Sequence, residues 1–297
     1  MRLKLGAAFL VIYIIWGSTY LAIRFVVETI PPFFMAGTRW IIAGLILYAL
    51  TRTRSTPSPT SLNWKHAFVI GGFLLLGGNG AVVWAEQWVP SGLTSLLIAT
   101  IPFWMVLLNS LHHRSRPSIG VIVGLIIGFA GVILLIGSIE NIGENSMIIP
   151  GVAIILFGSF LWANGSLYSR STETSSSQLQ AAAMQMIAGG ILLLSVSLIT
   201  GEWTRVMLDQ VSSRSMLSWL YLIVFGSIVA FSSYVWLLKQ TAPSLVSTHA
   251  YVNPVVAMIL GWVLADEALT SSNILAAIII VISVALITTY HVERKHT

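Results

Sequence analysis

The sequence has no cysteine, which excludes disulfides, thiolate nucleophiles and cysteine metal ligands. It also has few charged residues: Asp, Glu, Lys and Arg make up 8% of the 297 residues, against roughly 25% in soluble domains. Hydrophobic residues make up 56%, so a soluble globule of this chain could not cover its surface with polar groups. These absences indicate an integral membrane protein.

Long apolar runs occupy almost the whole chain. A membrane helix needs about 20 apolar residues, and the runs are too long and continuous for the strands of a membrane barrel. The ten predicted spans cover residues 7–27, 33–51, 66–86, 91–111, 118–138, 148–169, 179–199, 217–238, 244–264 and 272–290. The connections are too short for an extramembrane domain, so the function is expected to lie between the helices. The first run could be a signal peptide, but its length and the polar residues from Trp16 to Tyr20 favour a retained helix.

Positive charge is distributed unevenly among the connections. With a cytoplasmic N-terminus, eleven Lys and Arg residues fall on the cytoplasmic side and two outside, Arg205 and Arg214. This bias follows the positive-inside rule and places both termini in the cytoplasm. The expected location is the inner membrane of a bacterium. The same bias explains the net charge of +5 without a nucleic-acid partner.

The two halves of the chain resemble each other. A shift of 146 residues aligns Trp16 with Trp162, and a shift of 152 aligns Pro102 with Pro254. We predict two repeats, residues 1–145 and 146–297, with five helices each. Because five is an odd number, the second repeat must be inverted in the membrane relative to the first. Inverted repeats are typical of alternating-access transporters, with the substrate site near the midplane.

Several short motifs occur in a specific order. The first half has Trp16-Gly17-Ser18-Thr19-Tyr20, then Arg24, Pro31-Pro32, Arg39 and Ala43-Gly44; the second has Ala250-Tyr251-Val252-Asn253-Pro254-Val255 and Asp266-Glu267. In these motifs the chain resembles the EamA-like branch of the drug/metabolite transporter superfamily. The resemblance implies a ten-helix exporter of amino acids and related metabolites. Residues 112–116 depart from the family pattern, because a basic loop stands where relatives often have a glutamate.

Polar side chains predict which helices surround a cavity, because they are costly in mid-membrane unless they face protein or water. They gather in the first, third, fourth, sixth, eighth and ninth predicted helices. The candidate cavity residues are Tyr13, Trp16, Ser18, Tyr20, Asn79, Thr100, Trp162, Asn164, Ser166, Ser232, Tyr234, His249 and Asn253. Aromatic walls with a few hydrogen-bonding groups are usual in small-molecule sites. His249 is the candidate for any proton coupling, because imidazole changes charge near neutral pH.

Some of these residues have a second interpretation. Trp16 and Trp162 could be core packing instead of cavity walls, and Asn79 could make a hydrogen bond between helices. Arg39 lies near the outer end of its predicted helix, and we expect its side chain to extend to the lipid headgroups.

Prolines and glycines also carry expectations. Pro102 and Pro254 occupy equivalent mid-helix positions, where each is either a gating hinge or a static kink. The fifth predicted helix has glycines at four-residue spacing, which permits close helix contact within the chain or between two copies. The protein is therefore expected to be a monomer or a homodimer. These glycines are Gly120, Gly124 and Gly128.

The predicted function is secondary transport, namely the export of small neutral or zwitterionic metabolites such as amino acids by alternating access. The alternatives are a multidrug or other metabolite permease, an intramembrane enzyme and a channel. An enzyme is disfavoured because the sequence has no His-Glu-x-x-His motif, and a channel because it has no charged ring. Phosphorylated substrates are disfavoured because the ninth and tenth helices contain no Lys or Arg, and cation–proton exchange because the first helix contains no acid. The expected partners are a small-molecule substrate and membrane lipids, with no cofactor and no metal.

Overall fold

The computed structural model describes residues 2–52, 56–112, 118–137, 146–172, 177–241, 243–266 and 270–293, and every regular element in these ranges is a helix. The first half contains α1 (Arg2–Val27), α2 (Pro32–Arg52), α3 (Ser61–Gly71), η1 (Gly72–Asn79), α4 (Gly80–Ala85), α5 (Ser91–Ile98), α6 (Ile101–His112) and α7 (Ile119–Gly137). The second half contains α8 (Ile148–Ser171), α9 (Gln178–Ile199), η2 (Glu202–Arg205), η3 (Leu208–Gln210), α10 (Ser213–Tyr221), η4 (Leu222–Phe231), α11 (Ser232–Gln240), α12 (Pro243–Val246), α13 (His249–Ala265) and α14 (Ser271–Glu293).

Seven helical segments of the described chain are long and apolar enough to cross a membrane. They are Leu3–Val27, Pro32–Arg52, Ser61–Ala85, Ser91–His112, Ile148–Ser171, Gln178–Ile199 and Ser213–Gln240. The other three predicted spans coincide with α7, α13 and α14, which contain the apolar stretches Ile119–Gly128, Val252–Ala265 and Ser271–Ser283. Large apolar side chains such as Ile126, Leu198 and Trp262 are exposed on the outside of the helices. An apolar exterior of this kind fits a lipid environment, and the chain is an all-helical membrane protein.

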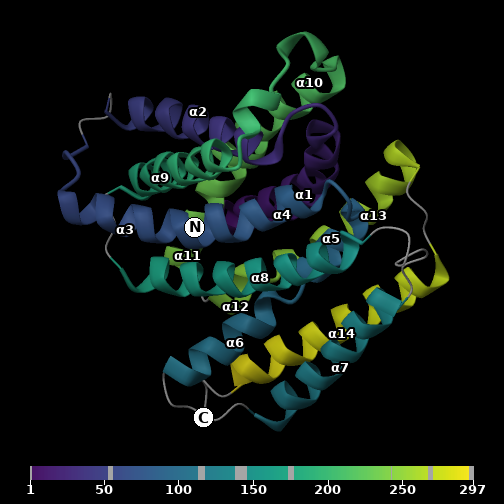
Figure 1. Cartoon of the computed structure of the whole chain (residues 1–297). Coiled ribbons are helices and arrows are strands. Elements are labelled where there is room, and N and C mark those ends of the chain that lie inside the picture. Colours follow the sequence, from purple (N-terminus) through teal and green to yellow (C-terminus); the bar gives the residue numbers. More distant parts are fainter. Residues whose placement is uncertain are drawn as a thin grey trace.

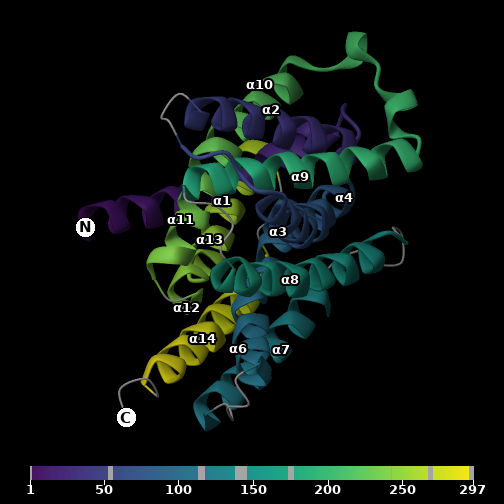
Figure 2. The ribbon, with the colours of Figure 1, turned by 90° about the vertical axis from the view of Figure 1, so that its left-hand side faces the viewer.

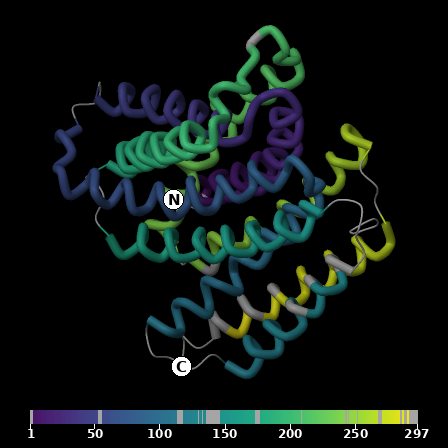
Figure 3. Tube along the Cα trace, viewed as in Figure 1, coloured from purple at the N-terminus to yellow at the C-terminus, as the bar shows by residue number. Residues whose placement is uncertain are grey.

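The two halves of the chain interleave instead of forming separate bodies. α2 packs along α9, and α1 packs along α13 (Figure 1). The Cα trace shows the early and late parts of the sequence alternating through the bundle (Figure 3). α7 and α14 pack against each other at one edge of the molecule in both ribbon views (Figures 1 and 2). The remaining long helices surround the middle of the bundle, and the residues that meet there come from both halves.

The glycines of α7 contact α14 of the same chain. Ser283 Oγ donates a hydrogen bond to the carbonyl of Gly124 at 2.5 Å. A side chain at Gly120 would collide with the ring of Tyr290, and one at Gly128 would collide with Ser283. The sequence allowed these glycines to serve helix contact within the chain or between two copies. In the described helices they serve contact within the chain.

Three of the predicted spans depart from regular α-helix. η1 and η4 are wider π-helical segments, and they lie in the third and eighth predicted spans at corresponding positions of the two halves. π-helical segments are rare and are frequent at functional sites. The fourth span is divided by a turn at Ala99 and Thr100. Pro102 consequently lies in the first turn of α6 instead of mid-helix, whereas Pro254 lies inside α13 as the sequence predicted.

Candidate functional site

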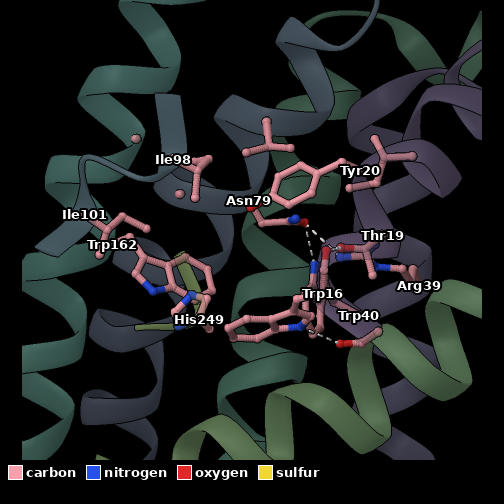
Figure 4. A pocket seen from close by; sticks show the side chains of 15 residues that line it. Trp16, Thr19, Tyr20, Arg39, Trp40, Asn79, Ile98, Ile101, Trp162 and His249 are labelled. Atoms are coloured by element: carbon pink, nitrogen blue, oxygen red, sulfur yellow. Dashed lines mark hydrogen bonds between the residues drawn. The ribbon is translucent and has the colours of Figure 1, made fainter. Parts of the chain in front are cut away.

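A cavity of about 70 Å³ lies in the middle of the bundle (Figure 4). Since a water needs roughly 10–15 Å³ of such space, the cavity has room for several waters. Helices of both halves contribute to its wall. The lining residues are Trp16, Thr19, Tyr20, Ile23, Arg39, Trp40, Gly78, Asn79, Val82, Ile98, Ile101, Gly158, Trp162, Gly226 and His249.

One wall of the cavity is aromatic. The rings of Trp16 and Trp162 meet edge to face, with centroids 5.6 Å apart and an interplanar angle of 82°. The Trp16 Nε1–H donates to the carbonyl of Gly226 at 3.2 Å, and the Trp162 Nε1–H donates to Tyr234 Oη at 2.8 Å. Buried indoles with satisfied N–H groups are held in fixed orientations. The aromatic wall is therefore rigid and offers π-faces and edges to a ligand.

Tyr234 supports this wall from behind. It is fully buried, and its ring centroid lies 4.9 Å from that of Trp16 and 5.5 Å from that of Trp162. Its hydroxyl also hydrogen bonds with Ser166 Oγ at 2.6 Å, and Ser166 in turn donates to the carbonyl of Trp162 at 2.7 Å. Tyr234 and Ser166 thus position the tryptophans and do not line the cavity.

The opposite wall is polar and is built around Asn79. Its Oδ1 accepts hydrogen bonds from Arg39 Nη2 at 3.0 Å and from Trp40 Nε1 at 2.9 Å (Figure 4). The Arg39 guanidinium also lies over the Trp40 ring, 4.4 Å from its centroid. The sequence suggested two roles for Asn79, a hydrogen bond between helices and a place in the cavity wall. In the structure Asn79 has both roles.

The expectation that Arg39 extends to the headgroups is wrong. Only 2% of Arg39 is exposed, and its side chain turns into the bundle. A buried guanidinium requires hydrogen-bond and π partners, and Asn79 and Trp40 supply both. The sequence offered one signal that could have indicated this, a lone arginine within an apolar helix.

His249 and Asn253 connect α13 to α1. His249 Nδ1 lies 2.8 Å from the carbonyl of Val246, and because a carbonyl only accepts, Nδ1 carries the proton in this arrangement. The His249 ring packs against Trp16 with centroids 5.0 Å apart. With its nitrogen turned to these acceptors, the Asn253 amide donates to the carbonyls of His249 at 2.9 Å and Tyr13 at 3.1 Å.

The structure divides the predicted site residues into three groups. Those that line the cavity are Trp16, Tyr20, Asn79, Trp162 and His249. Those that contact these lining residues from behind are Ser166, Tyr234 and Asn253. The others, which do not line the cavity, are Tyr13, Ser18, Thr100, Asn164 and Ser232.

Most residues of the third group make local or interhelical hydrogen bonds. Tyr13 Oη bonds with Thr248 Oγ1 at 2.6 Å, and Ser18 Oγ bonds with the Tyr221 hydroxyl at 2.6 Å. Thr100 and Asn164 donate to backbone carbonyls of their own segments, at 2.7 and 2.9 Å. These polar groups therefore have hydrogen-bond partners within the protein and need no ligand. Polar side chains in membrane helices generally pair in this way.

Sequence reasoning missed Trp40 and the small and aliphatic members of the wall. Ile98 and Ile101 flank the turn between α5 and α6, and nothing distinguishes them in sequence from lipid-facing isoleucines. Gly78 had a signal, because it lies in Gly77-Gly78-Asn79-Gly80. A Cβ at Gly78 would lie 2.6 Å from Trp162 Cε3, so glycine is what lets η1 approach the aromatic wall.

Two acids lie buried near this region. Glu86 follows α4, is fully buried, and acts electrostatically on Arg39. Glu202, in the connection after α9, accepts a hydrogen bond from the backbone N–H of Phe34 at 2.9 Å and so caps the start of α2. Burial raises the pKa of the Glu202 carboxyl, and the hydrogen bond from Phe34 partly opposes that rise. Within the described ranges, no group of three His, Cys, Asp or Glu residues is placed to hold a metal ion.

Comparisons with known proteins place the chain in a family. The EamA-like transporter family matches the chain twice, over residues 4–137 and 149–289. The uncharacterized inner membrane transporter YedA of Escherichia coli strain K12 is 40% identical over 287 residues, which cover 96% of this chain and 91% of YedA. The uncharacterized transporter YoaV of Bacillus subtilis is 24% identical, covering 95% of this chain and 96% of YoaV. A protein of known crystal structure shares the fold with a TM-score of 0.70 at 19% identity, over 97% of this chain and 98% of the other.

Proposed function

Because this chain belongs to the EamA-like transporter family, we propose that it is a secondary transporter that exports small neutral or zwitterionic metabolites, such as amino acids. One observation carries the proposal: a cavity at the centre of the bundle is lined by both halves of the chain, and Trp16 and Trp162, one from each half, form its aromatic wall with ring centroids 5.6 Å apart. Aromatic faces with a few fixed hydrogen-bonding groups suit a small amphipathic solute.

The proposal includes the membrane arrangement. The chain crosses the inner membrane ten times, with both termini in the cytoplasm, as two inverted five-helix repeats of residues 1–145 and 146–297. The double match of the family supports this division. So does the packing, because α1 contacts α13 in the way that α8 contacts α5 and α6, which hold the corresponding positions.

The proposed mechanism is alternating access. One group of helices moves against the other, so that the cavity opens to one side of the membrane at a time. The turn at Ala99 and Thr100 and the adjacent Pro102 lie beside the cavity-lining Ile98 and Ile101, where a hinge would change the shape of the wall. Pro254 inside α13 is the second proposed hinge. The proposed hinges are therefore a turn in the first half of the chain and an in-helix proline in the second half.

Solute counterflow in proteoliposomes tests the function. Purified protein is reconstituted with each of the twenty amino acids inside, and entry of the same labelled amino acid is followed with and without a pH gradient. We expect saturable counterflow for a subset of small amino acids, and weaker counterflow with Trp162→Ala. Counterflow with lipophilic cations but with no amino acid would favour a multidrug permease. Non-saturable flux that needs no internal solute would favour a channel and contradict the proposal.

A dependence on the pH gradient would separate coupled transport from facilitated diffusion. His249 remains the proposed coupling group, because its ring lines the cavity and its Nε2 is the nitrogen not bonded to Val246. His249→Gln keeps a hydrogen-bonding side chain that cannot change charge. If His249 couples transport to protons, this variant retains counterflow and loses accumulation driven by a pH gradient.

A further inference from the structure

We propose that Arg39 is the carboxylate-binding group of the cavity, and that the transported solutes are small monocarboxylates in general and not amino acids alone. This inference rests on the proposed transport function and names the substrate class of the same site. It starts from the unusual position of Arg39, which is a cavity-lining arginine with 2% of its surface exposed.

The guanidinium of Arg39 is only partly satisfied. Nη2 donates to Asn79 Oδ1 at 3.0 Å, while Nε is buried and has no hydrogen-bond partner among the described residues. A buried donor without a partner is unfavourable and points to a ligand that accepts from it. Arginine presents several N–H groups in a planar fork, and a carboxylate accepts from two of them at once.

Asn79 and Trp40 hold this fork in place. Asn79 Oδ1 accepts from both Arg39 and Trp40, and the Trp40 ring lies under the guanidinium at 4.4 Å. The guanidinium is thereby pre-oriented, so little side-chain entropy is lost when a carboxylate binds. Trp40 of α2 and Asn79 of η1 thus hold the guanidinium from two different helices.

The charge balance favours a monoanion. Among the described residues that line the cavity, Arg39 is the one with a permanent charge, and the charge of buried Glu86 acts on it from outside the lining. A single, partly balanced cation suits a carboxylate better than a phosphate dianion, for which binding sites usually gather several cationic groups.

The rest of the lining provides no counter-charge for an ammonium group. No Asp or Glu occurs among the lining residues of the described chain. The side chains of Trp162, Ile98 and Ile101 lie on the side of the cavity away from Arg39 (Figure 4). A solute is therefore held by its carboxylate at one end and by apolar contacts at the other. Replacing its ammonium by a hydroxyl or a keto group should cost little affinity.

Five probes test this on the wild-type protein in lipid nanodiscs: four have nearly the same shape, and the fifth, isobutylamine, lacks the carboxyl group. They are L-valine, 2-hydroxy-3-methylbutanoate, 3-methyl-2-oxobutanoate, valinamide and isobutylamine, with binding followed by tryptophan fluorescence. We expect the three carboxylates to bind with affinities within about tenfold of one another, and the amide and amine to bind at least tenfold more weakly. Valinamide binding as well as L-valine, or no binding of any carboxylate, would overturn the proposal.

Variants then assign the preference to Arg39. Arg39→Gln should bind L-valine and valinamide equally, and Arg39→Lys should keep part of the preference because it keeps the charge. The matched control is Arg24→Gln: Arg24 bonds the carbonyls of Glu86 and Gln87 and does not line the cavity, so its loss should leave the preference intact. A preference that persists in a folded Arg39→Gln variant contradicts the assignment. If that variant does not fold, the probe series on the wild type still tests whether the cavity prefers carboxylates.

The failure of this inference is distinguishable from failure of the proposed function. Counterflow of valinamide or isobutylamine equal to that of L-valine would leave a transporter without carboxylate selectivity. Absence of counterflow for all five probes and all amino acids, in a protein that binds carboxylates through Arg39, would remove the transport function and keep the binding site.

Discussion

Trp162 and Tyr234 are joined by a hydrogen bond of 2.8 Å from the indole N–H to the phenol oxygen, although 72 residues separate them in the sequence. Tyr234 lies on α11 and Trp162 on α8, so the bond ties two helices together behind the cavity. It also fixes the plane of the ring that faces Trp16. The orientation of one cavity wall thus depends on a residue that does not touch the cavity.

Tyr234→Phe should therefore destabilise the protein and weaken solute binding. The substitution leaves the partly buried Trp162 Nε1–H without its acceptor, which costs about 1–3 kcal/mol. The measurement is thermal unfolding in nanodiscs together with probe affinity. Tyr48→Phe is the control, because Tyr48 lies far from the wall, packed against Trp64 at 6.2 Å, and its hydroxyl makes no hydrogen bond within the described structure. Equal stability of the two variants would argue against the role of the Trp162–Tyr234 bond.

Gly78→Ala should move the aromatic wall. The new Cβ would lie 2.6 Å from Trp162 Cε3, so the ring has to shift, and such overpacking typically costs about 1–3 kcal/mol. We expect a lower melting temperature and altered probe binding. Gly72→Ala in the same π-helical segment is the matched control, because its Cβ would meet its nearest neighbour, Leu192, at 3.5 Å, an ordinary contact. Similar behaviour of the two variants would contradict the close fit between η1 and Trp162.

Transport rates test whether the two prolines act as hinges. Pro254→Ala restores a backbone N–H inside α13 and should stiffen that helix, which slows counterflow and leaves probe binding largely intact. Pro102→Ala should have a smaller effect, because Pro102 lies in the first turn of α6, where no helical hydrogen bond is missing. Rates equal to wild type in both variants would make the prolines static features.

Glu202 predicts a dependence of stability on pH. Burial raises the pKa of its carboxyl in the folded protein above the unfolded value. The protonated carboxyl therefore contributes to the stability of the folded protein at low pH, and this contribution is lost as pH rises through the folded pKa. The melting temperature of the wild type should therefore fall relative to Glu202→Gln between pH 4 and pH 8. Glu28→Gln, which changes an exposed acid of another connection, is the control and should follow the wild type. A constant difference between wild type and Glu202→Gln across this range would contradict the prediction.

Cysteine substitutions test the membrane topology, and the absence of native cysteines removes any background. The exposed positions Thr204 and Ser271 should react with an impermeant thiol reagent added to intact spheroplasts. The exposed positions Ser58 and Ser171 should react only after permeabilisation, because the positive-inside rule places them in the cytoplasm. Labelling of Ser171 from outside would contradict the inverted repeat.

The sequence by itself determined the class of the protein and the bounds of its helices. Apolar runs of about 20 residues permit little besides membrane helices, and the helices of the structure begin and end within a few residues of most predicted spans. The aromatic pair was also readable, because Trp16 and Trp162 are aligned by the shift between the halves. Hydrophobicity and repeat period are local or collinear properties, so they can be found without knowing which helices touch.

Only the tertiary structure decided which side chains share the cavity. Asn164 and Thr100 look as suitable in sequence as Asn79, but they turn to backbone carbonyls of their own segments. Arg39 became a cavity residue because Asn79 and Trp40 meet it inside the bundle. Whether a polar group in a membrane helix faces a partner, a cavity or the headgroups depends on the rotation of each helix against its neighbours. That rotation is set by packing between distant segments, which the linear pattern does not contain.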